Sequence, residues 1–459
     1  MVLGLAPTGC YAPAIEACRL ACSDSRCPAG LTCNAQGLCA TSASEVCSAP
    51  PTDGSELGDV IVEVRDAEGQ PFGNARVLFV DRQGVTVDDV LTGSEGTAMA
   101  RMESGGNATV IRTISGPGEG AEVWVTTFVD LPPAAHVISA HTVDRERTRP
   151  VELHWTPHDD AQQYDVYTSC VGLSSAMTTR VTLAVPTTCP RFDVVVIGRD
   201  STGAPIGTLA LGDQTGPAVE LANAWVDPTT RGGMLDDAPT NAAATQLSIG
   251  GSLTAGVPHV PSLVSLFPSS TGDLGTLPLP RDMQLVSAVA LARVPDTDSP
   301  AQVVIDHPEA SETRFVISLD GKVLPWVTPP ATSLATNTLR WSVAPPANVT
   351  PAEPAFVVAT MSYRRKESNI HWRLVAPAHW ITDLSGDARE LVFPDVPGTQ
   401  PFEPPPGDTV LDGEVALHAT NPAAADAWRM TAEVATADDD PFDVPGLMWA
   451  TLSVSHPHR

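Results

Sequence analysis

The chain has 459 residues and carries 26 Lys and Arg against 54 Asp and Glu, a formal net charge of −28. Charge of this sign repels a phosphate backbone, which argues against a nucleic-acid-binding protein. No apolar run reaches the roughly 18 residues that a membrane-spanning helix needs. The length predicts about three domains at roughly 150 residues each. The 43 prolines favour loops and edge strands over helices.

Seven of the nine cysteines lie in the first 47 residues, and the other two follow at positions 170 and 189. Crowding of this kind is typical of a disulfide framework, which persists in oxidising compartments. Zinc binding is the weaker alternative, because zinc sites usually show C-x2-C pairs or nearby histidines. Here the spacings are wider, and the first histidine is His136. The predicted disulfide cysteines are Cys18, Cys22, Cys27, Cys33, Cys39, Cys47, Cys170 and Cys189.

The ninth cysteine, Cys10, follows the short run Leu5–Gly9. This run resembles the end of a bacterial lipoprotein signal, and the resemblance implies that Cys10 is lipidated and that residues 1–9 are a signal remnant. Lipidation would leave eight cysteines, six pairing among themselves within Cys18–Cys47 and Cys170 pairing with Cys189. The alternative is that Cys10 is an unpaired or intermolecular thiol.

Residues 10–57 are predicted to form a small disulfide module and a linker, and Cys27–Cys39 is similar to the Cys-rich knots of extracellular proteins. A module of this size buries too little apolar area to be stable without its bridges.

Residues 58–138 predict a first β-sandwich, because short strands alternate with turns rich in Gly, Pro and Asp. Val60–Val64 and Ala75–Val80 are strand candidates on either side of the turn Asp66–Pro71, and Glu95–Thr97 marks a later turn. These features resemble the carboxypeptidase regulatory-like family. The resemblance implies a prealbumin-like β-sandwich that serves as an accessory module without catalytic residues.

Residues 139–228 predict a second sandwich. Val151–Trp155 alternates, and Tyr164–Val171 and Arg191–Gly198 follow as further strands. A strand with Trp, a polar turn and a strand with Tyr are similar to a fibronectin type III module. Cys170 lies in one predicted strand and Cys189 just before another, so a bridge between them is geometrically reasonable.

Residues 229–459 continue the strand pattern and predict one large or two small sandwiches, with an alternative break near 345–351. Asp320–Gly321, between Thr313–Leu319 and Lys322–Leu324, predicts a β-hairpin. Arg429–Val434 is predicted to be another strand. The order of a Cys-rich knot, a regulatory-like sandwich and Trp-bearing strands ahead of Val392–Pro397 resembles myxobacterial surface lipoproteins.

Four groups of residues are candidate sites, and each has a simpler structural interpretation. Gly116–Gly120 superficially suggests a dinucleotide loop, but the spacing and Pro117 favour a surface turn. His154, His158, Asp159 and Asp160 could bind a metal, although a solvated turn is favoured. Asp438–Asp440 with Asp443 could bind calcium, although an acidic loop is the default. His371 and His379, each followed by a Trp (Trp372 and Trp380), could form a sugar-binding face, although Trp residues of alternating strands are more often core.

The sequence therefore predicts an all-β chain of tandem Ig-like or prealbumin-like sandwiches behind a small disulfide-rich module. We expect a non-enzymatic lipoprotein of the cell envelope, at the outer membrane or surface, or a secreted protein. No cofactor, metal or catalytic residue is predicted, and the expected partner is a surface protein or a glycan. The alternatives are a secreted hydrolase of polysaccharide or peptide, with His371, Trp372 and His379 on its candidate face, and a calcium-dependent adhesive stalk.

Overall fold

Strands account for nearly all the regular structure of this computed structural model, which divides into the units Met1–Asp53 and Gly54–Arg459. The structure describes residues 32–33, 39–40 and 42, and then 57–455 apart from 67–69, 115–121, 141–147, 188, 228, 255–259, 267–271, 280–282, 294–301, 312, 366–367, 395–408 and 432–448. In the first unit, β1 (Thr32–Cys33) pairs with β2 (Cys39–Ala40), so that Cys33 lies opposite Cys39. The all-β fold class is confirmed.

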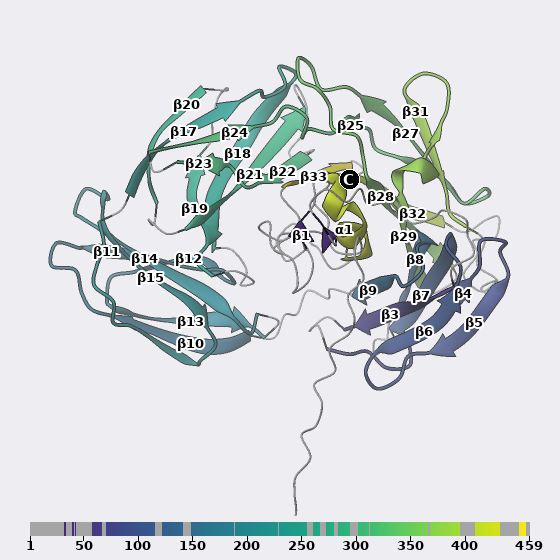
Figure 1. Cartoon of the computed structure of the whole chain (residues 1–459), viewed down its shortest axis with the longest axis horizontal. Helices are drawn as coiled ribbons and strands as arrows, with labels where there is room; N and C mark the ends of the chain where they lie inside the picture. The colour runs from purple at the N-terminus through teal and green to yellow at the C-terminus, as the bar shows by residue number, and fades with distance from the viewer. Residues whose placement is uncertain are drawn as a thin grey trace, which may run out of the picture. The chain divides into compact units, whose positions relative to one another are not determined.

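The second unit is organised by one sheet of twelve strands (Figure 1). Runs of consecutive buried residues, such as Val125–Val129 and Leu374–Ala376, place buried side chains on both faces of this sheet, so the sheet is covered from either side. From one edge to the other its strands are β19 (Val260–Leu266), β18 (Ala242–Ser252), β21 (Gln284–Arg293), β22 (Gln302–Asp306), β33 (Trp449–Ser455), β32 (Thr409–Thr420), β28 (Phe356–Arg365), β29 (Ser368–Pro377), β8 (Glu122–Leu131), β7 (Gly106–Ile114), β4 (Arg76–Val80) and β5 (Thr86–Leu91).

A three-stranded sheet covers the β4–β7–β8 end of this long sheet. It contains β6 (Thr97–Met102), β3 (Gly58–Arg65) and β9 (His136–Ala140). The alternate residues of β3 are fully buried, and Val60 and Val62 pack in one core with Phe79 and Phe128 of the long sheet. This core also contains Met430 of the short helix α1 (Ala425–Thr431).

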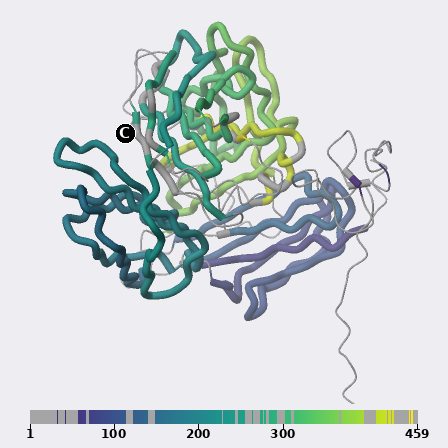
Figure 2. Tube along the Cα trace, turned by 60° about the vertical axis from the view of Figure 1, so that its left-hand side comes forward, coloured from purple at the N-terminus to yellow at the C-terminus, as the bar shows by residue number. Residues whose placement is uncertain are grey.

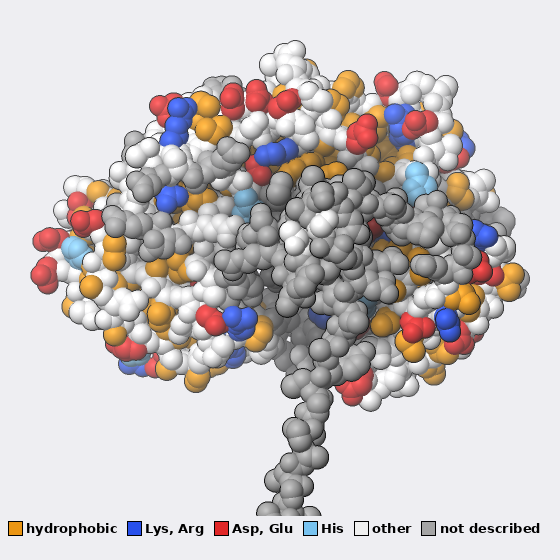
Figure 3. All heavy atoms as spheres, viewed as in Figure 1, with side chains coloured by type: hydrophobic (Ala, Val, Ile, Leu, Met, Phe, Trp, Pro, Cys, Tyr) orange, Lys and Arg blue, Asp and Glu red, His pale blue; other side chains and the backbone are white. Residues whose placement is uncertain are grey.

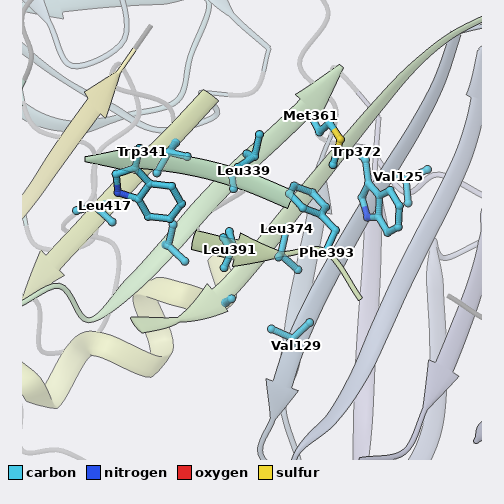
Figure 4. Packing of buried hydrophobic residues seen from close by; sticks show 14 of the residues in the cluster. Val125, Val129, Leu339, Trp341, Met361, Trp372, Leu374, Leu391, Phe393 and Leu417 are labelled. Atoms are coloured by element: carbon cyan, nitrogen blue, oxygen red, sulfur yellow. The ribbon is translucent and has the colours of Figure 1, made fainter. Parts of the chain in front are cut away.

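Two further sheets pack against the long sheet. The first has the order β20 (Gly272–Leu279), β17 (Thr229–Asp236), β24 (Arg314–Ser318) and β23 (Glu309–Ala310), and it shares a core with β18, β21 and β22. The second contains β25 (Trp326–Val327), β26 (Ala331–Ser333), β27 (Thr338–Ala344), β30 (Thr382–Asp383) and β31 (Ala388–Val392). Figure 4 shows the core beneath this second sheet, where Trp341, Leu391 and Phe393 meet Trp372 and Leu417 of the long sheet. The 3-10 turns η1 (Ala378–Trp380) and η2 (Pro422–Ala424) follow strands of the long sheet.

A separate two-sheet sandwich lies within residues 148–221. One sheet contains β13 (Arg180–Pro186), β10 (Thr148–Trp155) and β16 (Ala218–Leu221), and the other contains β12 (Gly172–Ala176), β11 (Gln163–Thr168), β14 (Phe192–Arg199) and β15 (Pro205–Gln214). Trp155, Tyr164 and Phe192 are buried between them. The outer face of β11 and β14 also joins the neighbouring core, since Tyr167 donates a hydrogen bond to the Leu263 carbonyl at 3.3 Å.

Two local predictions were wrong. The predicted hairpin at Asp320–Gly321 does not form, because Lys322–Leu324 is not a strand and β24 pairs with β17 and β23. Val323 and Leu324 are instead fully buried, and the Gln302 side chain pairs with the backbone of Leu324. The predicted strand Arg429–Val434 begins within α1. An Ala-rich run opened by Pro422, with Asp426 in the first turn, favours a helix over a strand.

Strand pairing runs across the predicted domain boundaries. β8, from the region expected to form the first sandwich, pairs in parallel with β29, from the C-terminal region, from Asn369 opposite Glu122 to Val375 opposite Phe128. Figure 2 traces the chain through these regions in sequence colours. The predicted boundaries at 58, 139 and 229 therefore stay predictions within a unit that the long sheet joins together.

Candidate functional site

One face of the long sheet carries polar side chains on five adjacent strands. Ile111, Val125 and Trp372 point into the core beneath β27, so the residues next to them in sequence point to the opposite face. The strand register sets these opposite residues in two rows, which we call the polar face. The first row is Arg112, Trp124, His371, Ser362 and Asp412, and the second is Thr126, Arg373, Thr360 and Glu414.

An aromatic stack lies in the first row. The rings of Trp124 and His371 are stacked, with centroids 4.4 Å apart and planes inclined by 21°. His371 Nδ1 lies 2.9 Å from Ser362 Oγ, which fixes the ring on its other side. Burial lowers the pKa of His371, while the charge of Glu122 acts in the opposite direction. His371 is therefore held towards its neutral form.

The Ser362–His371 contact resembles part of a nucleophile and base arrangement. A triad also needs a third group that orients the histidine. Among the described residues, the carboxylate that acts on His371 is that of Glu122, and it acts through its charge. The described contacts of His371 are therefore the Trp124 ring and Ser362 Oγ.

Arg112 lies at the edge of the polar face. Only 3% of it is exposed, and its Nη1 donates to the Arg65 carbonyl at 3.0 Å. It borders a cavity of about 390 Å³ that Phe72 and Arg76 also line. The Arg76 guanidinium is already engaged by both carboxylate oxygens of Asp89.

His418 of β32 points to the same side of the sheet as the polar face, but it lies further along the strands, opposite Phe356 of β28. Its ring stacks on Phe356 at 4.4 Å. Burial lowers the pKa of His418 to about 3, and the positive charge of Arg373 acts in the same direction. The imidazole is therefore neutral at ordinary pH.

The sugar-binding face proposed from the sequence is not assembled. Trp372 is 2% exposed and donates from Nε1 to Thr127 Oγ1 within the core. His379 is exposed and lies 3.1 Å from an Asp130 carboxylate oxygen, and Trp380 donates to the Val392 carbonyl at 3.3 Å. Neighbours in a strand point to opposite faces, which separates His371 from Trp372. The aromatic partner of His371 is Trp124, which sequence reasoning missed because it lies on a strand far away in the chain.

The other proposed clusters do not form a metal site in the described residues. His154 lies 3.6 Å from a Glu152 oxygen, and the His158 ring packs edge-on against Trp225 at 5.3 Å. The Asp160 amide donates to His158 Nδ1. Across the described ranges, no group of three His, Cys, Asp or Glu side chains converges as metal ligands. Gly116–Gly120 and Asp438–Asp443 lie outside those ranges.

Cys170 and Cys189 form a disulfide with Cα atoms 6.2 Å apart. The bridge links the end of β11 to the segment before its neighbour β14, and Arg149 donates to the Cys189 carbonyl at 3.3 Å. Of the other predicted cysteines, the backbones of Cys33 and Cys39 are paired across β1 and β2. Cys10, Cys18, Cys22, Cys27 and Cys47 lie outside the described residues.

No known family model matches the sequence, and no curated protein matches it. Among solved structures, the TIE protein of Bacillus anthracis aligns over 57% of this chain and 50% of its own, with 8% identity and a TM-score of 0.15. The major pilin subunit of Bacillus cereus aligns over 57% of this chain and 99% of its own, with 9% identity and a TM-score of 0.15. A putative adhesin from Bacteroides ovatus aligns over 34% and 77%, with 13% identity and a TM-score of 0.13. The chain thus spans half the length of the first of these. Scores this low do not establish a shared arrangement.

Proposed function

We propose that this chain is a non-enzymatic, extracytoplasmic β-sandwich protein that displays or binds a ligand at the cell envelope. The observation that carries the proposal is the Cys170–Cys189 bridge within an all-β scaffold. Disulfides persist in oxidising compartments, and rigid tandem sandwiches hold loops and faces away from an attachment point.

A non-enzymatic role is supported by the way the candidate residues are used. His371 is engaged by Trp124 and Ser362, while His379 pairs with Asp130. These side chains serve separate local contacts, so the hydrolase alternative loses the face on which it depended.

Attachment through a lipid at Cys10 is the part of the proposal that would place the protein on a membrane. Within the described part of the chain, no helix has the length and apolar character needed to cross a bilayer. Acylation of Cys10 would supply an anchor, with residues 1–9 removed. The six cysteines from Cys18 to Cys47 would then form a bridged module ahead of the sandwiches.

The partner would be a surface protein or a glycan. The negative charge is spread over several elements on the face shown in Figure 3 rather than gathered into one patch. Acidic side chains on this face repel a phosphate backbone, which disfavours nucleic acid as the partner.

Fractionation of cells that express the native protein tests the proposal. The peptide beginning at Cys10 should carry diacylglycerol or three acyl chains by mass spectrometry. The Cys10→Ser variant should leave the membrane fraction while keeping the Cys170–Cys189 bridge. Recovery of the unmodified protein with reduced Cys170 and Cys189 from the cytoplasm would refute the assignment.

A further inference from the structure

Lys322 is an unusual cation in this chain. Among the 26 Lys and Arg residues, only Lys322 and Lys366 are lysines, and Lys366 lies outside the described residues. The other described ion pairs use Arg or His. Position 322 thus carries an amine, which becomes a nucleophile once it loses its proton, whereas a guanidinium keeps its proton.

The Lys322 side chain reaches from one sheet of a core to the other. Lys322 follows β24 of the four-stranded sheet, and its Nζ lies against Oδ2 of Asp306, the last residue of β22 in the long sheet. The side chain of Asp306 is 7% exposed and that of Lys322 is 21% exposed. An amine nitrogen and a carboxyl group are therefore held in contact with little access to water.

The backbone is fixed at both residues. The Lys322 amide donates to the Leu319 carbonyl at 3.1 Å, and Thr451 Oγ1 donates to the Lys322 carbonyl. Asp306 is paired with Ser287 on one side and with Trp449 on the other. Such fixation favours a reaction between the two side chains, since well-oriented groups reach effective concentrations of roughly 10⁵–10⁸ M.

From this geometry we propose that Lys322 and Asp306 form an amide cross-link within the chain. The Lys322 ammonium gives one proton to the Asp306 carboxylate, and the neutral Nζ then attacks Cγ. A C–N bond forms, one C–O bond breaks, and the released hydroxyl leaves as water with a second amine proton. The step consumes no oxidant, reductant or other reactant.

Burial favours the product. Two charges held away from water carry a desolvation cost, and an amide has no formal charge. The link would tie the turn after β24 to β22, and it would therefore join the two sheets covalently across the core that they share. Lys322→Arg would keep the charge at this position and remove the nucleophile.

Peptide mass spectrometry of the full-length protein, with its disulfides reduced, tests the cross-link. Trypsin cleaves after Arg and after a free Lys, but not after a lysine whose side chain is an amide. The proposal expects residues 294–314 joined to residues 315–340, lighter by one water than the two peptides together. Lys322→Arg should give residues 294–314 as a separate peptide and cleavage after position 322.

A second variant serves as the matched control. Arg191 forms an exposed ion pair with Asp213 at 2.6 Å, so Arg191→Lys places a lysine beside a carboxylate in contact with water. This variant should lose no water at position 191, because the solvated pair has no desolvation cost to relieve. The proposal is overturned if wild-type Lys322 is cleaved by trypsin at full peptide mass. It is also overturned if the loss of water persists in Lys322→Arg.

Discussion

Removing the Cys170–Cys189 bridge perturbs one sandwich while leaving the rest of the chain as an internal control. The bridge closes a loop with a sequence separation of 19 residues between β11 and β14. Loop-closure entropy for a ring of this size corresponds to about 3 kcal/mol. The variant Cys170→Ser/Cys189→Ser should therefore lower the free energy of opening of this sandwich by about 3 kcal/mol, a loss of roughly 100-fold in amide protection.

Hydrogen exchange measured by mass spectrometry resolves this effect by peptide. Protection should fall in peptides from β11 and β14, which pair with each other beside the bridge. It should stay unchanged in β3, whose buried side chains belong to a different core. An equal loss in β3, or no loss in β11 and β14, would refute the reasoning that the bridge stabilises this sandwich locally.

Three further predictions concern buried polar groups. The folded-state pKa of His418 is about 3, so the unfolded chain binds a proton at this residue at a higher pH than the folded chain does. The free energy of unfolding should therefore fall by about 2 kcal/mol between pH 6.5 and 5. Urea titrations of His418→Gln should show a weaker dependence of this free energy on pH, and an unchanged dependence would contradict the prediction. Asp193 is fully buried, and its carboxylate accepts hydrogen bonds from the backbone amides of Asp213 and Leu253 at 2.9 and 2.8 Å. The Asp193→Ala variant should lower the free energy of local opening by about 3 kcal/mol and Asp193→Asn should lower it less. Amide hydrogen exchange near Leu253 measures this loss. Arg429 is 5% exposed and donates a hydrogen bond to the Val129 carbonyl at 3.1 Å. The Arg429→Met variant should lose about 2 kcal/mol of stability, and the amides of α1 should exchange faster. Unchanged protection of α1 would contradict a stabilising role for this contact.

Strand alternation made much of the fold predictable. In β3 the buried and partly exposed residues alternate as the sequence pattern required, and beyond the end of this strand Asp66 accepts the Gln70 amide at 2.8 Å. The Cys170–Cys189 bridge also followed from the two strand positions. Such local patterns report the face of a strand but not its partner.

Partners far apart in sequence could not be predicted. The parallel pairing of β8 with β29 and the insertion of β33 between β22 and β32 depend on tertiary packing. The candidate site shows the same limit. His371 was singled out from the sequence, but its stacking partner Trp124 is brought to it only by the β8–β29 pairing.

Protease treatment of intact cells tests the central claim, that the chain displays its sandwiches outside the cytoplasm, most directly. The account predicts that peptides from β10 to β16 are released without lysis, with Cys170 and Cys189 recovered as a disulfide-linked pair. Peptides that appear only after lysis, with both cysteines reduced, would contradict it.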